Sequence, residues 1–385
     1  MQNVYIAGQV QTLLFFLNRQ IMAYRRLVSI AFKLLLFLPL QAAPDIMFWN
    51  LENFFDYFDD GYSSSDRDFS SFGPKHWTKA RFGKKCNMVG KTVLWAGNMC
   101  PDGHPPEIVG FAEVENAFVM HKIAGSDILR KSGYSIIHFE SHDRRGIDVA
   151  LMYMRDSLEL IASRAFPIPD GEGGIMATRD ILYAALRDSE GKTVHVLVNH
   201  HPSKFGGAAA SRKKRDCAMQ RLSEICDSLI SLSSGPVVAM GDFNDVPSAS
   251  QFDLIGNMRN LAMPLHAKGE GTIRFRGKWE LIDHFLVSSG GMSAESEADS
   301  VSSSASCPGS AAVSSAGSVA DSASGSFSAP AVANYRMSIL RPPFLLEKDN
   351  AHTGEKPFRA YSGPRYLGGV SDHLPILLTS ASGNM

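Results

Sequence analysis

The chain has 385 residues, of which 44% are hydrophobic and 20% are charged. This composition is typical of a globular protein and excludes a disordered or collagen-like chain. The formal net charge is −1, which excludes a general positive field that would hold a polyanion without specificity, so any phosphate-bearing partner must be recognised locally.

The N-terminal segment predicts an export leader. Two arginines, Arg25 and Arg26, precede a mostly apolar stretch over residues 27–40, and small residues follow it. This order of basic, apolar and small residues is typical of a secretory signal. We therefore expect residues 1–43 to be a leader and the mature protein to be secreted or periplasmic, whereas an uncleaved leader would anchor the chain to a membrane.

Strand and helix patterns follow one another along residues 44–385, which we interpret as one domain. Apolar runs predict strands at 46–50, 107–113, 134–139, 147–154, 181–187, 193–200, 236–242, 281–288 and 375–380. Periodic apolar positions predict helices over 80–97, 117–131 and 209–232. Several strands follow one another without a helix between them. This order disfavours a purely parallel sheet and favours mostly antiparallel sheets covered by helices.

One segment of this domain differs from the rest in composition. Residues 289–333 are mostly Ser, Ala, Gly and other small residues, and no Lys or Arg occurs between Lys278 and Arg336. Such a stretch cannot bury enough apolar surface to offset its conformational entropy. We expect a disordered insertion in a surface loop, not a domain boundary, because strand patterns resume after it.

Polar side chains occur where many of the predicted strands begin or end. The motifs are WNLEN (49–53), GFAEVEN (110–116), VNHHPSK (198–204), GDFND (241–245), IDHFLVS (282–288) and SDHLP (371–375). A polar group beside a core costs desolvation free energy unless it gains a partner, and a metal ion with hydrogen-bonded surroundings would serve all six motifs. The five cysteines lack C-x-x-C spacing, so oxygen donors, and with them Mg²⁺ or Mn²⁺, are favoured over zinc.

In this order the six motifs resemble those of the endonuclease/exonuclease/phosphatase superfamily. That superfamily includes pancreatic-type deoxyribonuclease, abasic-site endonucleases, inositol polyphosphate 5-phosphatases and bacterial sphingomyelinases. The resemblance extends over roughly residues 45–380. It implies an α/β fold, a four-layered α/β sandwich with two central, mostly antiparallel sheets, and a divalent-metal phosphoesterase site at one edge.

The resemblance also implies which residues bind metal and substrate. Glu113 resembles the principal metal-binding glutamate, with Asn50 beside it and Asp372 completing the ligand set. Arg179 resembles an arginine directed at substrate phosphate, for which a surface salt bridge is the alternative. Glu113 has the alternative of an exposed acid at a strand end.

Five further residues resemble the catalytic groups of the superfamily. His200 resembles the histidine that contacts the scissile phosphate, and Asp242 with Asn244 resembles the pair that orients and activates the attacking water. His373 resembles the histidine opposite the metal, and Asp283 its orienting carboxylate. The alternative for the segment from Asp242 is a turn that closes the strand.

These patterns predict a Mg²⁺-dependent hydrolase of phosphodiester bonds, with a nuclease as the first candidate. The alternatives are a phospholipid, inositol-phosphate or sugar-phosphate phosphatase, and a non-catalytic binding module on the same fold. The expected partner is a phosphate-ester substrate, including nucleic acid. No stable protein partner is implied, so we expect a monomer. Loops that the motifs do not describe select the substrate.

Overall fold

Two six-stranded β-sheets form the centre of the fold. The first contains β1 (Ile46–Phe54), β2 (Ile108–Val114), β3 (Tyr134–His138), β4 (Asp148–Met154), β13 (Tyr335–Ile339) and β18 (Ile376–Ser380). The second contains β5 (Leu158–Phe166), β6 (Ile181–Asp188), β7 (Thr193–His200), β8 (Val237–Asp242), β9 (Met258–Asn260) and β12 (Asp283–Ser288). The strand orders are β13-β18-β1-β2-β4-β3 and β5-β6-β7-β8-β12-β9.

The computed structural model describes residues 43–380, except 62, 205–206, 234 and 289–334. The predicted leader, apart from Ala43, and the predicted insertion lie outside the described residues, so both stay predictions. Within the described ranges, no helix has the length and apolarity needed to cross a bilayer. The four described cysteines, Cys86, Cys100, Cys217 and Cys226, are free thiols.

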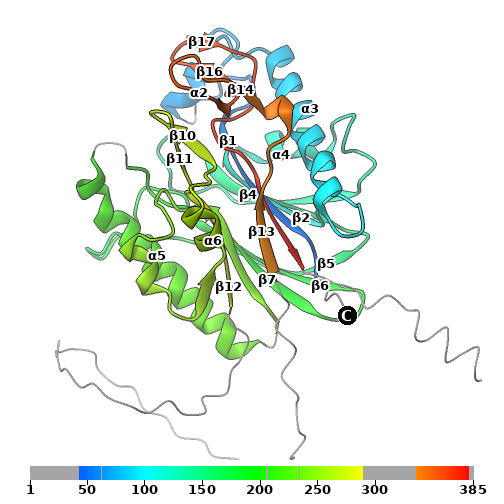
Figure 1. The fold of residues 1–385 in the computed structure, drawn as a ribbon, viewed down its shortest axis with the longest axis vertical. Coiled ribbons are helices and arrows are strands. Elements are labelled where there is room, and N and C mark those ends of the chain that lie inside the picture. Colours follow the sequence, from blue (N-terminus) through cyan, green and yellow to red (C-terminus); the bar gives the residue numbers. More distant parts are fainter. Residues whose placement is uncertain (1–42, 62, 205–206, 234, 289–334, 381–385) are drawn as a thin grey trace, which may run out of the picture. The chain divides into compact units, whose positions relative to one another are not determined.

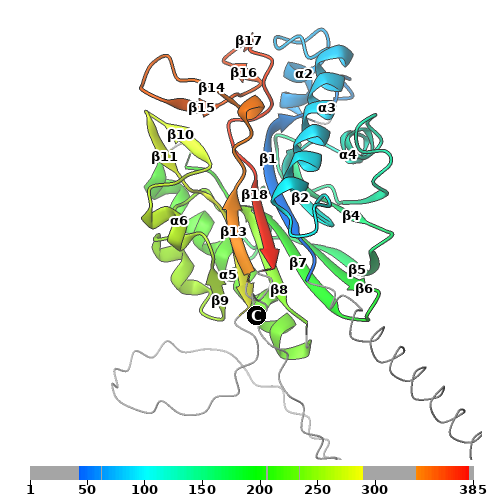
Figure 2. The ribbon, with the colours of Figure 1, turned by 45° about the vertical axis from the view of Figure 1, so that its right-hand side comes forward.

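Helices cover the outer faces of the two sheets. The helices are α2 (Ser64–Phe69), α3 (Lys79–Ala96), α4 (Ala117–Ala124), α5 (Ala208–Leu232) and α6 (Met263–Ala267), of which α3, α4 and α5 pack on the outer faces. In the ribbon views, α3 and α4 lie on one side of the sheets and α5 on the other (Figures 1 and 2). Short hairpins gather at one end: β10 (Ile273–Phe275) with β11 (Lys278–Glu280), β14 (Leu346–Lys348) with β15 (Glu355–Pro357), and β16 (Tyr361–Ser362) with β17 (Arg365–Tyr366).

Three apolar cores separate four layers. Successive side chains of a strand point to opposite faces, so Phe48 of β1 packs into the core between the sheets and Met47 into the core beneath α3 and α4. The third core joins β7 and β8 to Leu222 and neighbouring residues of α5. The predicted four-layered sandwich is therefore confirmed.

Both sheets are mostly antiparallel, as predicted. Among the described strands, β1 runs parallel to β2 and β7 parallel to β8, while the other neighbouring pairs are antiparallel. Parallel neighbours end at the same edge of a sheet. Strand β18 is antiparallel to β1, and β12 is antiparallel to β8. The beginnings of β18 and β12 therefore lie beside the ends of β1 and β8.

Two details of the predicted elements were wrong. The helix predicted over 117–131 ends at Ala124, because Gly125 terminates it and turns follow. Strands β5, β9 and β13 of the two large sheets were not predicted. All three are edge strands, and the side chains of β5 are largely exposed and lack a clear apolar alternation.

Candidate active site

Two irregularities in the first sheet place polar side chains at its edge. The β1–β2 pairing shifts register between Asn50 and Phe54, and the β2–β4 pairing shifts at Glu113. Glu52, Asn53 and Glu113 have positive φ angles of 50°, 51° and 60°. Such bulges interrupt strand alternation and re-aim side chains, and left-handed non-glycine residues cluster at functional sites. As a result, the Asn53 backbone N–H donates to Glu113 Oε2 at 2.7 Å.

The second sheet places three predicted residues side by side. His200, at the end of β7, pairs in register with Asp242 at the end of β8, and Asp242 pairs with Asp283 at the start of β12. All three are nearly inaccessible to solvent. The register of three adjacent strands therefore brings the predicted groups together.

His373 and Asp283 form a buried ion pair. His373 Nδ1 lies 2.8 Å from Asp283 Oδ2, which also accepts a hydrogen bond from the Thr272 hydroxyl. Burial by itself would lower the pKa of His373, but Asp283 and the other nearby carboxylates outweigh burial and raise that pKa well above 6.5. His373 is therefore an imidazolium at neutral pH, with its Nε2 directed toward Asp242 Oδ2 at 3.8 Å.

Asp242 accepts hydrogen bonds from both sides. Its Oδ1 accepts from the Asn244 backbone N–H at 2.8 Å, and its Oδ2 accepts from Asn50 Nδ2 at 3.0 Å. Burial, followed by the charge of Asp283, raises the pKa of Asp242 to about 7. A carboxylate with a pKa near neutrality can accept a proton from an attacking water.

His200 occupies the space between the two sheets. Its Nε2 lies 3.8 Å from Glu113 Oε1 and 3.7 Å from Asp242 Oδ2. Burial, with a contribution from Arg179, lowers its pKa well below 6.5. The ring is thus neutral, and an N–H at Nε2 can donate to a substrate oxygen.

The predicted metal ligands Asn50, Glu113 and Asp372 lie near the catalytic candidates, but Asp372 is paired with an arginine. Asn50 and Glu113 lie at adjoining strand ends, but Asp372 Oδ2 accepts from Arg359 Nη2 at 3.1 Å. The same guanidinium donates to Glu52 Oε1 from Nε at 2.9 Å and from Nη2 at 2.6 Å. Glu52 and Arg359 were missed as candidates. Glu52 is visible in WNLEN as a second carboxylate, whereas Arg359 belongs to a loop without a motif.

The donor set fits a hard divalent cation. Glu52, Glu113 and Asp372 supply carboxylate oxygens and Asn50 a carboxamide oxygen, which are the ligand types that Mg²⁺ and Mn²⁺ prefer. The buried Lys85 lies close by and donates to the Glu52 carbonyl at 2.9 Å. Burial lowers the Lys85 pKa to about 8, although Glu52 and Glu113 act to raise it. A cation bound here would compete with Arg359 for Glu52 and Asp372.

Two groups among the described residues have the compact spacing of metal ligands. One is Asp242, Asp283 and His373, and the other, on β3, β4 and the loop between them, is His138, Glu140 and Asp148. A protonated imidazole that is bonded to a carboxylate is not a metal ligand. The geometry therefore favours proton handling, not metal ligation, by the first group.

Asn244 lies beside Asp242, whereas the Arg179 side chain is buried in the protein. Asn244, with a φ of 51°, donates from Nδ2 to the His201 carbonyl at 3.0 Å beside Asp242. The Arg179 side chain is only 4% exposed, and it donates to the His200 carbonyl at 3.2 Å, the His201 carbonyl at 2.7 Å and Asp143 Oδ2 at 2.9 Å. Three donors of Arg179 are therefore used inside the protein, where they hold the end of β7, and its role as a direct phosphate contact stays a prediction.

Glu115 offers a test of pH-dependent stability at the edge of the site. Its Oε2 accepts from the Asp56 backbone N–H at 2.7 Å, and burial raises its pKa to about 8. The folded-state pKa exceeds the unfolded value, so folding takes up a proton and stability falls as pH rises from about 4.5 to 8.

We expect Glu115→Gln, which keeps the acceptor and removes the ionisation, to stabilise the fold by about 1–2 kcal/mol at pH 8. The effect should be close to zero at pH 4.5. Thermal unfolding at both pH values measures it, and an equal change in Tm at the two values would contradict the assignment.

Comparisons with known proteins show the family and the fold. The model of a family described as "Endonuclease/Exonuclease/phosphatase family" matches residues 45–307. No curated protein matches the sequence.

Solved structures with a similar fold include an endonuclease/exonuclease/phosphatase family protein from Bacteroides thetaiotaomicron, at 14% identity over 88% of this chain and 98% of that one, with a TM-score of 0.50. A mannosyl-6-phosphatase from the same bacterium has 14% identity over 87% and 98%, with a TM-score of 0.49. The human Nocturnin catalytic domain has 13% identity over 87% and 93%, with a TM-score of 0.48. At these identities the likeness concerns the fold alone.

Proposed function

Since the chain belongs to the endonuclease/exonuclease/phosphatase family, we propose that it is a divalent-metal-dependent phosphoesterase that hydrolyses phosphodiester bonds. The observation that supports this proposal most directly is the pairing of a charged His373–Asp283 ion pair with Asp242, whose pKa is raised to about 7. A base and a positive charge then lie side by side, with 3.8 Å between Asp242 Oδ2 and His373 Nε2, at the strand ends where the other candidate groups gather.

Each group has a role that follows from its protonation state. Asp242 accepts the proton of the attacking water, and Asn244 helps to hold that water. His200 donates a hydrogen bond to a non-bridging phosphate oxygen, while the imidazolium of His373 stabilises the charge that develops on the phosphoryl group. When bound, a divalent cation held by Glu113 and Asn50 would supply further charge neutralisation to the phosphate.

A substrate panel with and without metal tests the proposal. Residues 44–385 would be incubated with Mg²⁺, Mn²⁺ or EDTA and with plasmid DNA, RNA, sphingomyelin, inositol phosphates or a chromogenic phosphodiester. We expect turnover of at least one substrate that depends on the added metal. Hydrolysis that continues after complete chelation would exclude the proposed mechanism.

The choice between nucleic acid and a smaller phosphate ester follows from the same panel. We also infer, from the order of basic, apolar and small residues before residue 44, that the enzyme acts outside the cytoplasm. Comparing the N-terminal residue of the secreted protein with the full sequence tests this second inference.

A further inference from the structure

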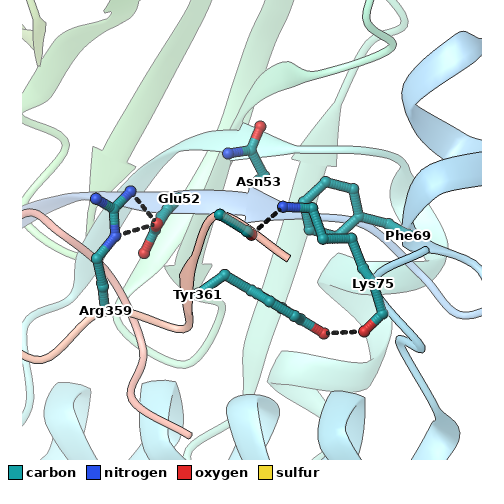
Figure 3. Close-up of a pocket in the computed structure, with 7 residues that line it drawn as sticks. Glu52, Asn53, Phe69, Lys75, Arg359 and Tyr361 are labelled. Atoms are coloured by element: carbon teal, nitrogen blue, oxygen red, sulfur yellow. Dashed lines mark hydrogen bonds and ion pairs between the residues drawn. The ribbon is translucent and has the colours of Figure 1, made fainter. Parts of the chain in front are cut away.

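A polar pocket adjoins the candidate active site (Figure 3). Its volume is about 360 Å³ including its open mouth, and we call it the Lys75 pocket. Its lining includes Asn53, Phe69, Lys75, Arg359 and Tyr361. Nothing in the proposed catalytic mechanism uses Lys75, Phe69 or Tyr361.

The Lys75 pocket is continuous with the site through the end of β1. The Asn53 backbone holds Glu113, and the Arg359 guanidinium holds Glu52 and Asp372. The same two residues, Asn53 and Arg359, form part of the pocket wall. A ligand group in this pocket would therefore lie next to a phosphoester bound at the candidate metal ligands.

Lys75 supplies a positive charge that no carboxylate neutralises. Its Nζ donates to the Gly363 carbonyl at 2.6 Å and lies 5.5 Å from the centre of the Phe69 ring and 5.2 Å from that of the Tyr361 ring. Ion pairs of described lysines are formed by Lys192, Lys204 and Lys356, so Lys75 has no acidic partner within the described part of the chain. Its remaining N–H groups are available to a ligand.

Arg359 and Asn53 add hydrogen-bond donors to the pocket, and Tyr361 holds Lys75 in place. The Arg359 side chain is 42% exposed, and Nε and Nη2 make its contacts with Glu52 and Asp372, which leaves Nη1 without a hydrogen bond to the described residues. In Figure 3 the Asn53 side chain lies above Glu52, with Arg359 on one side and Lys75 on the other. The Tyr361 hydroxyl donates to the Lys75 carbonyl at 3.0 Å, which holds the aromatic ring and the lysine together.

The charges of the pocket favour an anion. Glu52, the acidic residue in the lining, is compensated by Arg359 and by the Ala360 backbone N–H. Of the charged side chains in the lining, Glu52 is negative and Lys75 and Arg359 are positive, so the lining has one positive charge in excess, while Arg359 also pairs with Asp372 outside the lining. Phosphate oxygens are favourable acceptors for charged N–H donors such as those of Lys75 and Arg359.

We propose that the Lys75 pocket binds a second phosphate group of the substrate, next to the phosphoester that is hydrolysed. The assignment of this site to the substrate rests on the proposed function, because a substrate subsite exists only if the enzyme cleaves a phosphoester next to it. The anion site itself does not depend on catalysis. Nucleotides and sugar bisphosphates both present such a group.

Direct binding tests the anion site. Calorimetric titration of inorganic phosphate in EDTA, which removes binding through a metal, would compare the wild-type protein with Lys75→Met. Methionine keeps an unbranched stem against Phe69 and Tyr361 and removes the charge. We expect the phosphate Kd to rise at least tenfold in Lys75→Met and to stay unchanged in Lys79→Met, a matched loss of an exposed charge outside the pocket. An equal Kd in wild-type protein and Lys75→Met, or no binding by the wild-type protein, would overturn the proposal.

Kinetics of the metal-loaded enzyme test the subsite and distinguish the source of the phosphate. One substrate pair is thymidine 5′-(4-nitrophenyl phosphate) with and without a 3′-phosphate, and the other is glucose 1-(4-nitrophenyl phosphate) with and without a 6-phosphate. We expect kcat/KM to favour the bisphosphorylated member of one pair at least tenfold, through KM, and Lys75→Met but not Lys79→Met to abolish this preference.

The experiments distinguish failure of the proposed phosphoesterase function from failure of the proposed phosphate subsite. Phosphate binding that depends on Lys75, together with no metal-dependent turnover of any substrate, would contradict the proposed function and leave the anion site standing. Turnover with equal kcat/KM within both pairs would contradict the subsite and leave the phosphoesterase function standing.

Discussion

Asp242→Asn is expected to lower kcat by about 10³-fold or more without recovery at high metal concentration. The substitution keeps the shape of the side chain but removes its ability to accept a proton from water, and general-base catalysis contributes roughly 10²–10⁴-fold. Because the pKa of Asp242 is raised to about 7, the base is lost as pH falls through about 7. The kcat/KM of the wild-type enzyme should therefore decrease on the acidic side of this value, and this dependence should be absent from any residual activity of Asp242→Asn.

A neighbouring acid supplies the control for this prediction. Asp245 belongs to the same motif but pairs with Lys204 at 2.8 Å and Arg215 at 3.4 Å, away from His373. Asp245→Asn should keep kcat within about threefold of the wild-type value. Circular dichroism and thermal unfolding would verify that both variants are folded. An active Asp242→Asn enzyme with an unchanged pH profile would show that another group is the base.

Glu113→Gln is expected to weaken metal binding, raising the Kd for Mn²⁺ at least tenfold. A carboxamide keeps the size of the side chain but lacks the charge that a hard cation requires. Activity at low metal concentration should fall accordingly, and excess metal should restore part of it. Calorimetric titration of Mn²⁺ measures the affinity without relying on turnover.

Glu115→Gln is the matched control for Glu113. The two glutamates are separated by one residue, but Glu115 accepts from the Asp56 backbone and from Asn116, away from the candidate ligands. Its removal should leave the Mn²⁺ Kd unchanged. Full activity of Glu113→Gln with an unaltered metal requirement would place the metal centre elsewhere, even though the family assignment would stand.

Local patterns were sufficient for much of the fold. The run of apolar residues before Asp242 predicted a buried strand, and β8 is buried along its whole length. Strand alternation in β1 follows from the sequence because neighbouring side chains must face different cores. Alternation failed for β5, since an exposed edge strand has no requirement for apolar side chains.

The sequence predicted which residues belong to the candidate site better than it predicted the contacts that they make. The ordered motifs predicted Asn50, Glu113, His200, Asp242 and Asp283 as site residues, because short strand-end segments keep their polar residues in a recognisable order. The register of β7, β8 and β12 then placed three of the predicted groups side by side. A motif does not contain the direction of a side chain, however, and Arg179 points into the protein.

The sequence by itself therefore determined most of the strands, their apolar faces and the polar groups at strand ends, because each depends on residues a few positions apart. Tertiary structure decided which charges meet. Arg359 is separated from Glu52 by 307 positions and Lys75 from Gly363 by 288, yet both pairs are in hydrogen-bond contact. Such contacts depend on how two sheets and their loops pack, and packing over that separation leaves no periodic pattern along the chain. The ion pair at the candidate metal ligands and the uncompensated charge of Lys75 are consequences of the folded chain alone.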